Sequence, residues 1–304
     1  MADARWRPDR PIELIAGTPQ GGGQDRAARA LAAALAPLLP TPIQVVNVPG
    51  RGGSVGWESL AATPGENHRL AISSPTLITN ALTGASRTGP RDLTAIAMLC
   101  TEYILFVVPP ASALRSAGDL LLRLADSPPP VTALATARGN VNHLALARLA
   151  RHAGASGSTI PVRVFDSARE AIADVLGGRA ELGAVSAASA TAETAAGILR
   201  GLAVTAPGRL PAPYALVPVW EELSVPCTIG TWRGLVAAPG MEEAAVRFWE
   251  QVVTTAVAAP GWQSDLRHYQ WTAFHLGAGA TAEFHQSEER SLSASLRDLG
   301  LIDG

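Results

Sequence analysis

Short apolar segments alternate with helical segments along the chain, and this alternation restricts the fold more than any other feature of the sequence. The first apolar run, Pro11–Ala16, ends in a glycine loop, and small and apolar residues then recur at helical spacing from Gln24 to Leu39. The same unit repeats, with strands predicted over Ile43–Val48 and Arg69–Ile72. Strands that alternate with helices at this spacing form a parallel sheet covered by helices, so the sequence predicts an α/β fold.

A second series of the same kind follows two apolar strands predicted at 93–99 and 103–108. Beyond them we expect helices over 117–125, 142–153, 168–176 and 190–199, alternating with strands over 131–135, 162–165, 182–185 and 201–205. A strand over 231–237 then crosses back, before long amphipathic helices over 241–258 and 282–299. This order predicts two lobes, residues 1–106 with 232–304 and residues 107–231, and two such lobes bracket a cleft suited to a small ligand.

Composition excludes several functional classes. All 24 basic residues are arginine, so Schiff-base chemistry and the lysine of a phosphate-binding loop are ruled out. A net charge of −2 without a basic run argues against nucleic-acid binding, and no apolar stretch approaches the ~20 residues of a membrane span. Cys100 and Cys227 are too few for a four-ligand metal site, so we expect no metal and no cofactor. They are either two buried thiols or one disulfide.

The loop Gly17–Asp25 is the strongest candidate for a binding site. It has four glycines between a predicted strand and a predicted helix. Glycines allow backbone N–H groups to converge on a ligand, and a helix N-terminus carries partial positive charge, so the loop predicts an anion site without a cationic side chain. Asp25 is expected to cap the helix, and the alternative is a plain tight turn. The candidate ligand-binding residues here are Thr18, Pro19, Gln20, Gly21, Gly22, Gly23, Gln24 and Asp25.

A second glycine loop, Gly50–Gly56, matches two catalytic or cofactor motifs superficially. Gly52-Gly53-Ser54-Val55-Gly56 has the G-x-S-x-G form of a nucleophile elbow, which makes a serine esterase using Ser54 the alternative function. The glycine spacing also resembles a dinucleotide fingerprint, but no acidic residue follows the next strand. A glycine turn that packs a helix is the interpretation we prefer.

Further polar loops follow later strands of the predicted sheets. Hydroxyls, amides and backbone N–H groups at these positions suit hydrogen bonding to carboxylate oxygens, although serine and asparagine are also ordinary helix caps. Arg169 is either a bidentate carboxylate ligand or a solvated residue of a first helical turn. The candidates in these loops are Ser73, Ser74, Gly139, Asn140, Val141, Asn142, His143, Asp166, Ser167, Arg169 and Ser186.

Six stretches, taken in order, carry a resemblance to a known family. They are TPQGGGQDRAARAL (Thr18–Leu31), NVPGRGGSVG (Asn47–Gly56), LTAIAMLCTEYILFVVP (Leu93–Pro109), REAIADVLGGRAELG (Arg169–Gly183), LRGLAVTAPGRLP (Leu199–Pro211) and WRGLVAAPG (Trp232–Gly240). Together they resemble the solute-binding proteins of tripartite tricarboxylate transporters, the Bug family of periplasmic receptors. The likeness is closest to the branch that binds tricarboxylates.

The resemblance implies a two-lobed fold of the type II periplasmic-binding-protein kind, with two parallel-type sheets and a ligand cleft between the lobes. It implies a non-enzymatic receptor that closes like a Venus flytrap on a small organic tri- or dicarboxylate and delivers it to the transporter's membrane components. It also implies a periplasmic protein whose signal peptide has been removed. We further expect this protein to be a monomer. Carried over by position, the ligand loops are Thr18–Asp25, Ser73–Ser74, Gly139–His143 and Asp166–Ser167.

Two departures from the family pattern bear on the ligand. Gln24 stands where the tricarboxylate branch often has an aromatic residue, so one pocket wall is changed. The fourth loop usually offers small residues, mostly glycine, whereas here it has Asp166 and Arg169. Asp166 facing the pocket would repel a polycarboxylate, which disfavours citrate. A mono- or dicarboxylate, or a ligand with an amino group, is therefore open.

Overall fold

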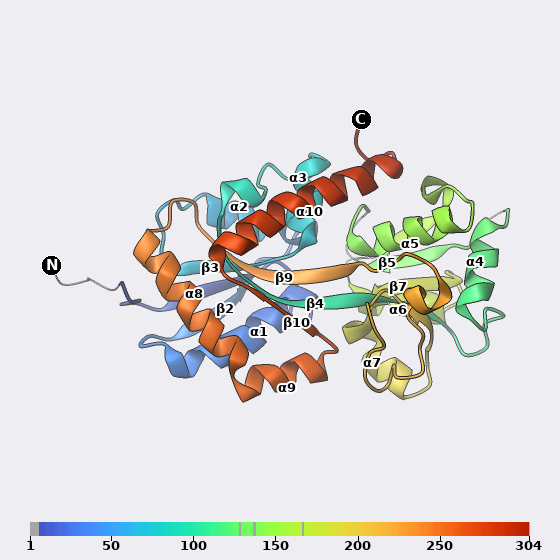
Figure 1. Ribbon diagram of the computed structural model, residues 1–304, viewed down its shortest axis with the longest axis horizontal. Coiled ribbons are helices and arrows are strands. Elements are labelled where there is room, and N and C mark those ends of the chain that lie inside the picture. The colour runs from blue at the N-terminus through green and yellow to red at the C-terminus, as the bar shows by residue number, and fades with distance from the viewer. Residues whose placement is uncertain (1–5, 128, 136–137, 166, 304) are drawn as a thin grey trace. The chain divides into compact units, whose positions relative to one another are not determined.

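A computed structural model describes residues 6–127, 129–135, 138–165 and 167–303, and it confirms the α/β fold (Figure 1). The strands are β1 Ile12–Ala16, β2 Ile43–Asn47, β3 Arg69–Ser73, β4 Thr94–Val108, β5 Thr132–Ala135, β6 Val162–Phe165, β7 Leu182–Ser186, β8 Arg200–Val204, β9 Gly230–Ala237 and β10 Thr272–Leu276. The helices are α1 Gly23–Leu35, α2 Ser54–Ala61, α3 Pro75–Leu82, α4 Ala117–Ala125, α5 Val141–His152, α6 Ala168–Leu176, α7 Ala187–Ala195, α8 Glu243–Ala258, α9 Pro260–His268 and α10 Ala278–Asp298. Short 3₁₀ turns include Arg51–Gly53 (η2) and Gly157–Thr159 (η4).

The chain forms two compact units. Unit 1 contains the residues up to Thr101 together with Trp232–His268 and Thr272–Leu292, and unit 2 contains Glu102–Thr231, Tyr269–Trp271 and the residues from Ser293 onward. The sequence assigned all of 232–304 to lobe 1, whereas the two short C-terminal pieces group with unit 2. The division into ligand-binding lobes stays a prediction.

In unit 1 the strand order is β2-β1-β3-β9-β4, and β10 also pairs with β4. The first three strands are parallel, while β9 runs antiparallel to β3. Helix α1 lies against β1 and β2 and also contacts α8 and α9. Because β1, β2 and β3 are parallel, the loops that follow them emerge at one edge of the sheet.

In unit 2 the order is β4-β7-β5-β6, with β8 also paired to β4. Strands β5, β6 and β7 are parallel to one another, so both sheets combine a parallel core with antiparallel additions. Alternate residues of β4 enter different cores: Ile104, Phe106 and Val108 pack in one cluster, and Leu105 and Val107 in another. This period of two is why the run is apolar throughout, since helices cover both faces of the sheet.

Four details of the sequence interpretation are corrected by the structure. The runs at 93–99 and 103–108 form one continuous strand, β4, and the helix predicted at 190–199 is α7, which begins at Ala187 and ends at Ala195. Helix α9 and strand β10 were not predicted. Strand β10 is mostly exposed or half-buried and lacks a run of apolar residues, so it carries no strand signal of its own.

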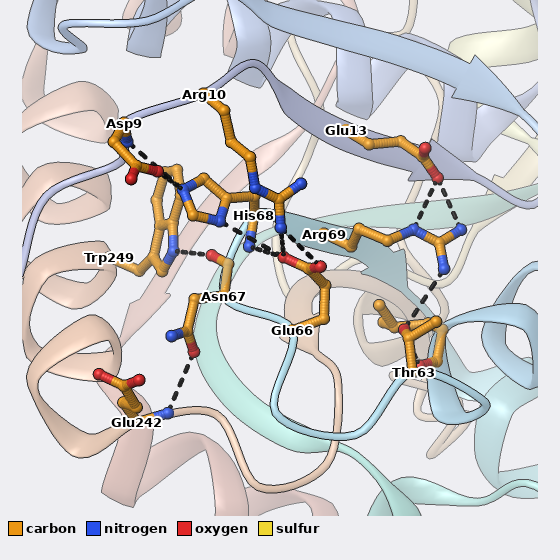
Figure 2. A network of polar contacts seen from close by, with 11 residues as sticks. Asp9, Arg10, Glu13, Thr63, Glu66, Asn67, His68, Arg69, Glu242 and Trp249 are labelled. Carbon is orange, nitrogen blue, oxygen red and sulfur yellow. Dashed lines mark hydrogen bonds and ion pairs between the residues drawn. The ribbon is translucent and has the colours of Figure 1, made fainter.

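A polar network fixes the end of the unit 1 sheet where β1 and β3 begin (Figure 2). The Arg10 guanidinium donates to both carboxylate oxygens of Glu66 at 2.7 Å, which ties the segment before β1 to the turn before β3. Arg69 on β3 donates to Glu13 on β1, at 3.0 Å from Nε and 2.7 Å from Nη2. The Trp249 indole on α8 donates to the carbonyl of Asn67 at 3.2 Å. These contacts fix the strand ends away from the glycine loops.

Candidate functional site

The glycine loop after β1 is organised around the buried carboxylate of Asp25, whose residue is 1% exposed. Asp25 Oδ2 accepts hydrogen bonds from the Gly21 amide at 2.8 Å and from Arg29 Nε at 3.0 Å. Asp25 Oδ1 accepts from Asn47 Nδ2 at 2.8 Å, and Asn47 Nδ2 also donates to the Thr18 carbonyl at 2.9 Å. The Asp25 carboxylate therefore holds the Gly17–Asp25 loop in place through these hydrogen bonds.

The expected capping role of Asp25 needs correction. The N-cap of α1 is Gly22, and Asp25 is the third residue of the helix. Its carboxylate bonds the Gly21 amide, one residue before the cap, instead of an N–H of the first turn. Burial raises the pKa of Asp25, but the hydrogen bonds from Arg29, Gly21 and Asn47 outweigh it and hold that pKa below its usual value. Asp25 is thus a buried anion, neutralised within the protein.

The Gln24 side chain joins the first glycine loop to the second. Gln24 is 2% exposed; its Oε1 accepts from the Gly17 amide at 2.9 Å, and its Nε2 donates to the Gly52 carbonyl at 3.4 Å. The two loops also touch directly, because a Cβ built on Gly17 would lie 2.5 Å from the Gly53 Cα. Gly53 has φ +112°, a conformation that favours glycine.

Ser54, the residue on which the esterase alternative depends, is fully buried at the start of α2. Its Oγ accepts a hydrogen bond from Asn80 Nδ2 at 2.9 Å, and Asn80 is its only side-chain partner among the described residues. An amide cannot take the proton of a nucleophile, and a nucleophile elbow exposes its serine. The G-x-S-x-G loop is therefore a packing turn in which Asn80 also binds the Arg51 carbonyl at 2.7 Å.

Ser73 and Ser74 lie at the same edge of the unit 1 sheet, at the end of β3 and at the N-cap of α3. They are 0% and 1% exposed, and neither hydroxyl oxygen has a hydrogen-bond partner within the described part of the chain. A buried hydroxyl without a partner is costly, and such groups are uncommon in folded proteins. A Cβ on Gly234, which is opposite Ser73 on β9, would lie 2.7 Å from Ser73 Oγ, so glycine there leaves room for the hydroxyl.

Unit 2 repeats at α5 the arrangement found at α1. Asn140 is the N-cap, and its Oδ1 accepts from the His143 amide at 3.0 Å. His143, the third helical residue, accepts with Nδ1 from the amide of Gly139 at 3.0 Å, as Asp25 does from Gly21. Gly139 and Gly21 both have positive φ, +75° and +81°. Each unit therefore holds a left-handed glycine in place through the third residue of the following helix.

The remaining predicted residues occupy varied positions. Val141 is a core residue, and Asn142 Nδ2 donates to the carbonyl of Ala184 at 2.7 Å. Ser167 caps α6 by accepting from the Glu170 amide at 3.3 Å, and Arg169 is exposed. The other predictions are placed as follows: Pro19 and Gln20 are exposed, Gly23 is the first residue of α1, Ser186 is the N-cap of α7, and Asp166 lies outside the described residues.

Sequence reasoning missed the side chains that connect the loops. Asn47 on β2 and Asn80 on α3 each bind two loop atoms, and neither was a site candidate. Asn47 is recognisable only through strand pairing, since it lies opposite Ala16 at the end of β1. Its side-chain amide donates to the carbonyl of Thr18, 29 residues earlier in the chain, and a local sequence pattern does not predict a contact over that separation.

Cys100 and Cys227 are both buried and are not joined in a disulfide, so the disulfide alternative is wrong. Burial raises the pKa of Cys227 to about 12, which keeps it a thiol. In the described ranges no group of three or more His, Cys, Asp or Glu side chains is placed to hold a metal ion. None of the helices in the described part of the chain is long and apolar enough to cross a membrane.

Acidification is expected to destabilise the protein through His143. Burial, with a smaller effect of the Arg138 charge, lowers the pKa of His143 from 6.5 to about 4. As the pH falls, the unfolded state therefore takes up the proton before the folded state does. The contribution of neutral His143 to stability is complete above pH 6.5 and is lost as the pH falls towards 4. Between pH 7.5 and pH 5 we expect this group alone to lower the free energy of unfolding by about 2 kcal/mol, measured by urea denaturation.

His143→Asn is the matched variant, because an asparagine oxygen can accept from Gly139 and does not titrate. His285, whose pKa burial also lowers to about 4, titrates equally in both proteins and cancels in the comparison. The variant should lose about 2 kcal/mol less than the wild type over the same pH interval. Equal losses in the two proteins would remove His143 as the cause.

The fold and its loops define a class of protein: a binding protein with helix N-termini and small polar groups gathered at the carboxyl edges of parallel strands. Residues 27–301 match the family described as the tripartite tricarboxylate transporter family receptor. This match covers most of the chain, and the protein belongs to that family.

Individual relatives agree with this assignment. Protein BugT of Bordetella pertussis is 27% identical over 240 residues, which cover 77% of this chain and 72% of BugT. The crystal structure of a TctC solute-binding protein from Polaromonas is 27% identical with a TM-score of 0.73, covering 96% of this chain and 99% of that one. The Rhodopseudomonas palustris protein Rpa4515, solved with adipate, has a TM-score of 0.87 at 21% identity, covering 96% and 98%, which shows the shared fold.

Proposed function

We propose that this protein is a non-catalytic periplasmic receptor that captures a small organic carboxylate with two or three carboxylate groups. It acts as a monomer and delivers the ligand to the membrane components of a tripartite tricarboxylate transporter. Membership of the receptor family supports this proposal, and the related R. palustris protein was solved with the dicarboxylate adipate. The buried Ser54, whose partner is an amide, supports a role without catalysis.

The observation that carries the proposal is the pair of buried hydroxyls of Ser73 and Ser74, which have no hydrogen-bond partner among the described residues. A serine hydroxyl donates one hydrogen bond, and a carboxylate oxygen accepts several. Such charge-assisted hydrogen bonds are worth about 1.5–3 kcal/mol each, and a ligand carboxylate at this position would also satisfy groups that otherwise lack a partner.

Backbone amides of α1 supply further donors at the same edge of unit 1. A helix leaves its first N–H groups without partners inside the helix. At α1 the Asp25 N–H donates to Thr18 Oγ1 at 3.2 Å, whereas the Gly23 and Gln24 amides have no acceptor among the described residues, and we assign these two amides to the ligand. Positive helix-end charge and N–H groups favour an anion, and the neutralised Asp25 does not oppose one.

In unit 2 the corresponding groups lie at the carboxyl ends of β5, β6 and β7. The helices α5, α6 and α7 begin there, with Asn140, Ser167 and Ser186 as their N-caps. The Val141 and Asn142 amides are the equivalents of Gly23 and Gln24. Participation of these residues in the ligand site, and closure of two lobes on the ligand, are the predictions that follow from the family resemblance.

Titration calorimetry with propionate, succinate, malate, adipate and citrate tests the ligand class. We expect one di- or tricarboxylate to bind with micromolar affinity, which corresponds to about −8 kcal/mol. Ser73→Ala and Ser74→Ala should each weaken that binding at least about tenfold, the effect of one lost charge-assisted hydrogen bond. The stability of these variants should not fall, because each substitution removes a hydroxyl that has no partner in the part of the chain that the structure describes.

Ser59→Ala is the control, since Ser59 Oγ already donates to the Gly56 carbonyl at 2.8 Å in the same unit. It should bind the ligand as the wild type does. Stabilisation by neutral compounds alone would contradict the carboxylate proposal. Wild-type affinity in the Ser73→Ala, Ser74→Ala double variant would remove these hydroxyls from the site.

A further inference from the structure

A small surface pocket lies in unit 2, formed by α5, the turn after it and the end of α10. Its volume is about 150 Å³, and Leu144, Ala147 and Ala155 provide its apolar lining. A cavity of this size holds a group about as large as benzene. Sites for whole organic ligands usually occupy roughly 300–1,000 Å³, so the pocket suits a side chain better than a metabolite.

The pocket is built on a close contact between α5 and η4. A Cβ on Gly157 would lie 2.6 Å from the Ala147 Cβ and 2.9 Å from its Cα, so the two segments meet without an intervening side chain. The turn that leads from α5 to η4 is held by the Ala155 amide, which donates to the Ala150 carbonyl at 2.8 Å. The walls are therefore preformed, which lowers the entropic cost of binding.

Two arginines and one carboxylate give the pocket its charge. Arg151 on α5 forms an ion pair with Asp298 at the end of α10. Arg148, one turn earlier, makes a single long hydrogen bond of 3.4 Å to the Thr228 carbonyl and has no ion pair among the described residues. The hydroxyl-bearing residues Ser156 and Ser295 also line the pocket. With two cations against one anion, the lining leaves a net positive charge beside an apolar surface.

We propose that this pocket binds the carboxylate side chain of a glutamate or aspartate on a partner protein. The methylene groups of that side chain pack against Leu144 and Ala147, and its carboxylate takes the guanidinium of Arg148, a geometry in which arginine binds carboxylates well. Asp298 is an internal competitor, since it already holds Arg151. The proposal concerns a docking surface and does not depend on the ligand bound at the Ser73 loop.

The helix that forms the pocket, α5, begins at the Gly139 turn, and the end of α10 contacts both. The segment containing Asp298 continues to Leu301, and a Cβ on Gly139 would lie 3.1 Å from Leu296 Cδ2 and 3.3 Å from Leu301 Cδ1. The end of α10 thus packs on the same Gly139 turn that begins α5. A partner side chain at Arg148 and Arg151 contacts one helix whose other end carries candidate ligand residues.

Amide chemical shifts of the ¹⁵N-labelled protein test the proposal with a defined probe, N-acetyl-glutamate N-methylamide. We expect saturable shifts at Ala155, Ser156 and Gly157 with a millimolar dissociation constant, and no saturable shifts with the isosteric N-acetyl-glutamine N-methylamide. Arg148→Met should weaken probe binding at least about fivefold, because it removes the charge and keeps most of the apolar stem. Arg115→Met, at an exposed arginine elsewhere in unit 2, is the matched control and should bind normally.

Asp298→Asn separates a binding role from a structural one. If Asp298 competes for Arg151, removing its charge should tighten probe binding roughly threefold to tenfold. If the ion pair only fastens α10 to α5, the variant melts at a lower temperature and binds the probe no better, which would overturn the proposal. Equal binding of the glutamate and glutamine probes, or propionate binding tighter than the capped glutamate, would also overturn it.

Discussion

Replacing Asp25 by alanine is expected to lower the free energy of unfolding by about 3 kcal/mol and to weaken carboxylate binding more than tenfold. The substitution removes the acceptor of the Gly21 amide and one of the two acceptors of Asn47 Nδ2, and it leaves a hole where the buried Asp25 carboxylate was. The Arg29 side chain is about half exposed, so its guanidinium can bind water once the carboxylate is removed. The loss in the free energy of unfolding should therefore stay near 3 kcal/mol. Binding falls because the Gly17–Gly23 loop is no longer held beside Ser73. Urea denaturation and calorimetry measure the two effects.

Asp119→Ala is the matched control, because Asp119 is also the third residue of a helix and accepts from the amides of Arg115 and Ser116 at 2.8 and 3.0 Å. Its hydrogen bonds are exposed to solvent, so the loss of Asp119 should cost clearly less stability than the loss of Asp25 and should leave ligand binding unchanged. If both variants lost equal stability, burial of the Asp25 network would not be the source of its effect.

The order of the elements was predictable because it depends on local periodicity. In unit 1 the strand PIELIA, its glycine loop and the helix after it each carry a signal within a few residues, and the structure places them as β1, the loop and α1. The same holds for β5 to α6 in unit 2. Where the predictions failed, as for β10, the strand forms only because it pairs with β4.

The roles of the loop residues were less predictable, because they depend on partners from other strands. The sequence predicts that Asp25 caps a helix. Its actual role depends on the pairing of β1 with β2, which brings the Asn47 side chain to the Asp25 carboxylate. In the sequence, Ser73 and Ser74 look like ordinary cap serines; only the structure shows that their buried hydroxyls lack a partner within the described ranges. A missing hydrogen-bond partner cannot be predicted from a sequence pattern. The contribution of each loop residue to ligand binding stays a prediction.

Gly17→Ala is expected to cost at least about 2 kcal/mol of stability and to abolish measurable ligand binding. Its new methyl group would lie 2.5 Å from the Gly53 Cα and 2.8 Å from Gln24 Oε1, so the two glycine loops must move apart. Gly53→Ala has two unfavourable effects. Its Cβ would lie 2.7 Å from Gln24 Nε2 and 2.9 Å from the Trp57 ring, and alanine would have to adopt a φ of +112°. It should cost about 3–5 kcal/mol, since backbone strain and overpacking both apply. Urea denaturation of each variant gives the comparison.

Gly65→Ala isolates the backbone contribution, because Gly65 also has a positive φ, +78°, but a Cβ there meets nothing within 4 Å. It should lose only about 1 kcal/mol and bind the carboxylate normally. If contact between the two loops organises the site, both variants that introduce a steric clash, Gly17→Ala and Gly53→Ala, must lose ligand affinity. Gly65→Ala, which introduces only backbone strain, must keep it. Normal binding by Gly17→Ala would mean that the first and second glycine loops act independently, and the carboxylate proposal would then depend on Ser73 and Ser74 alone.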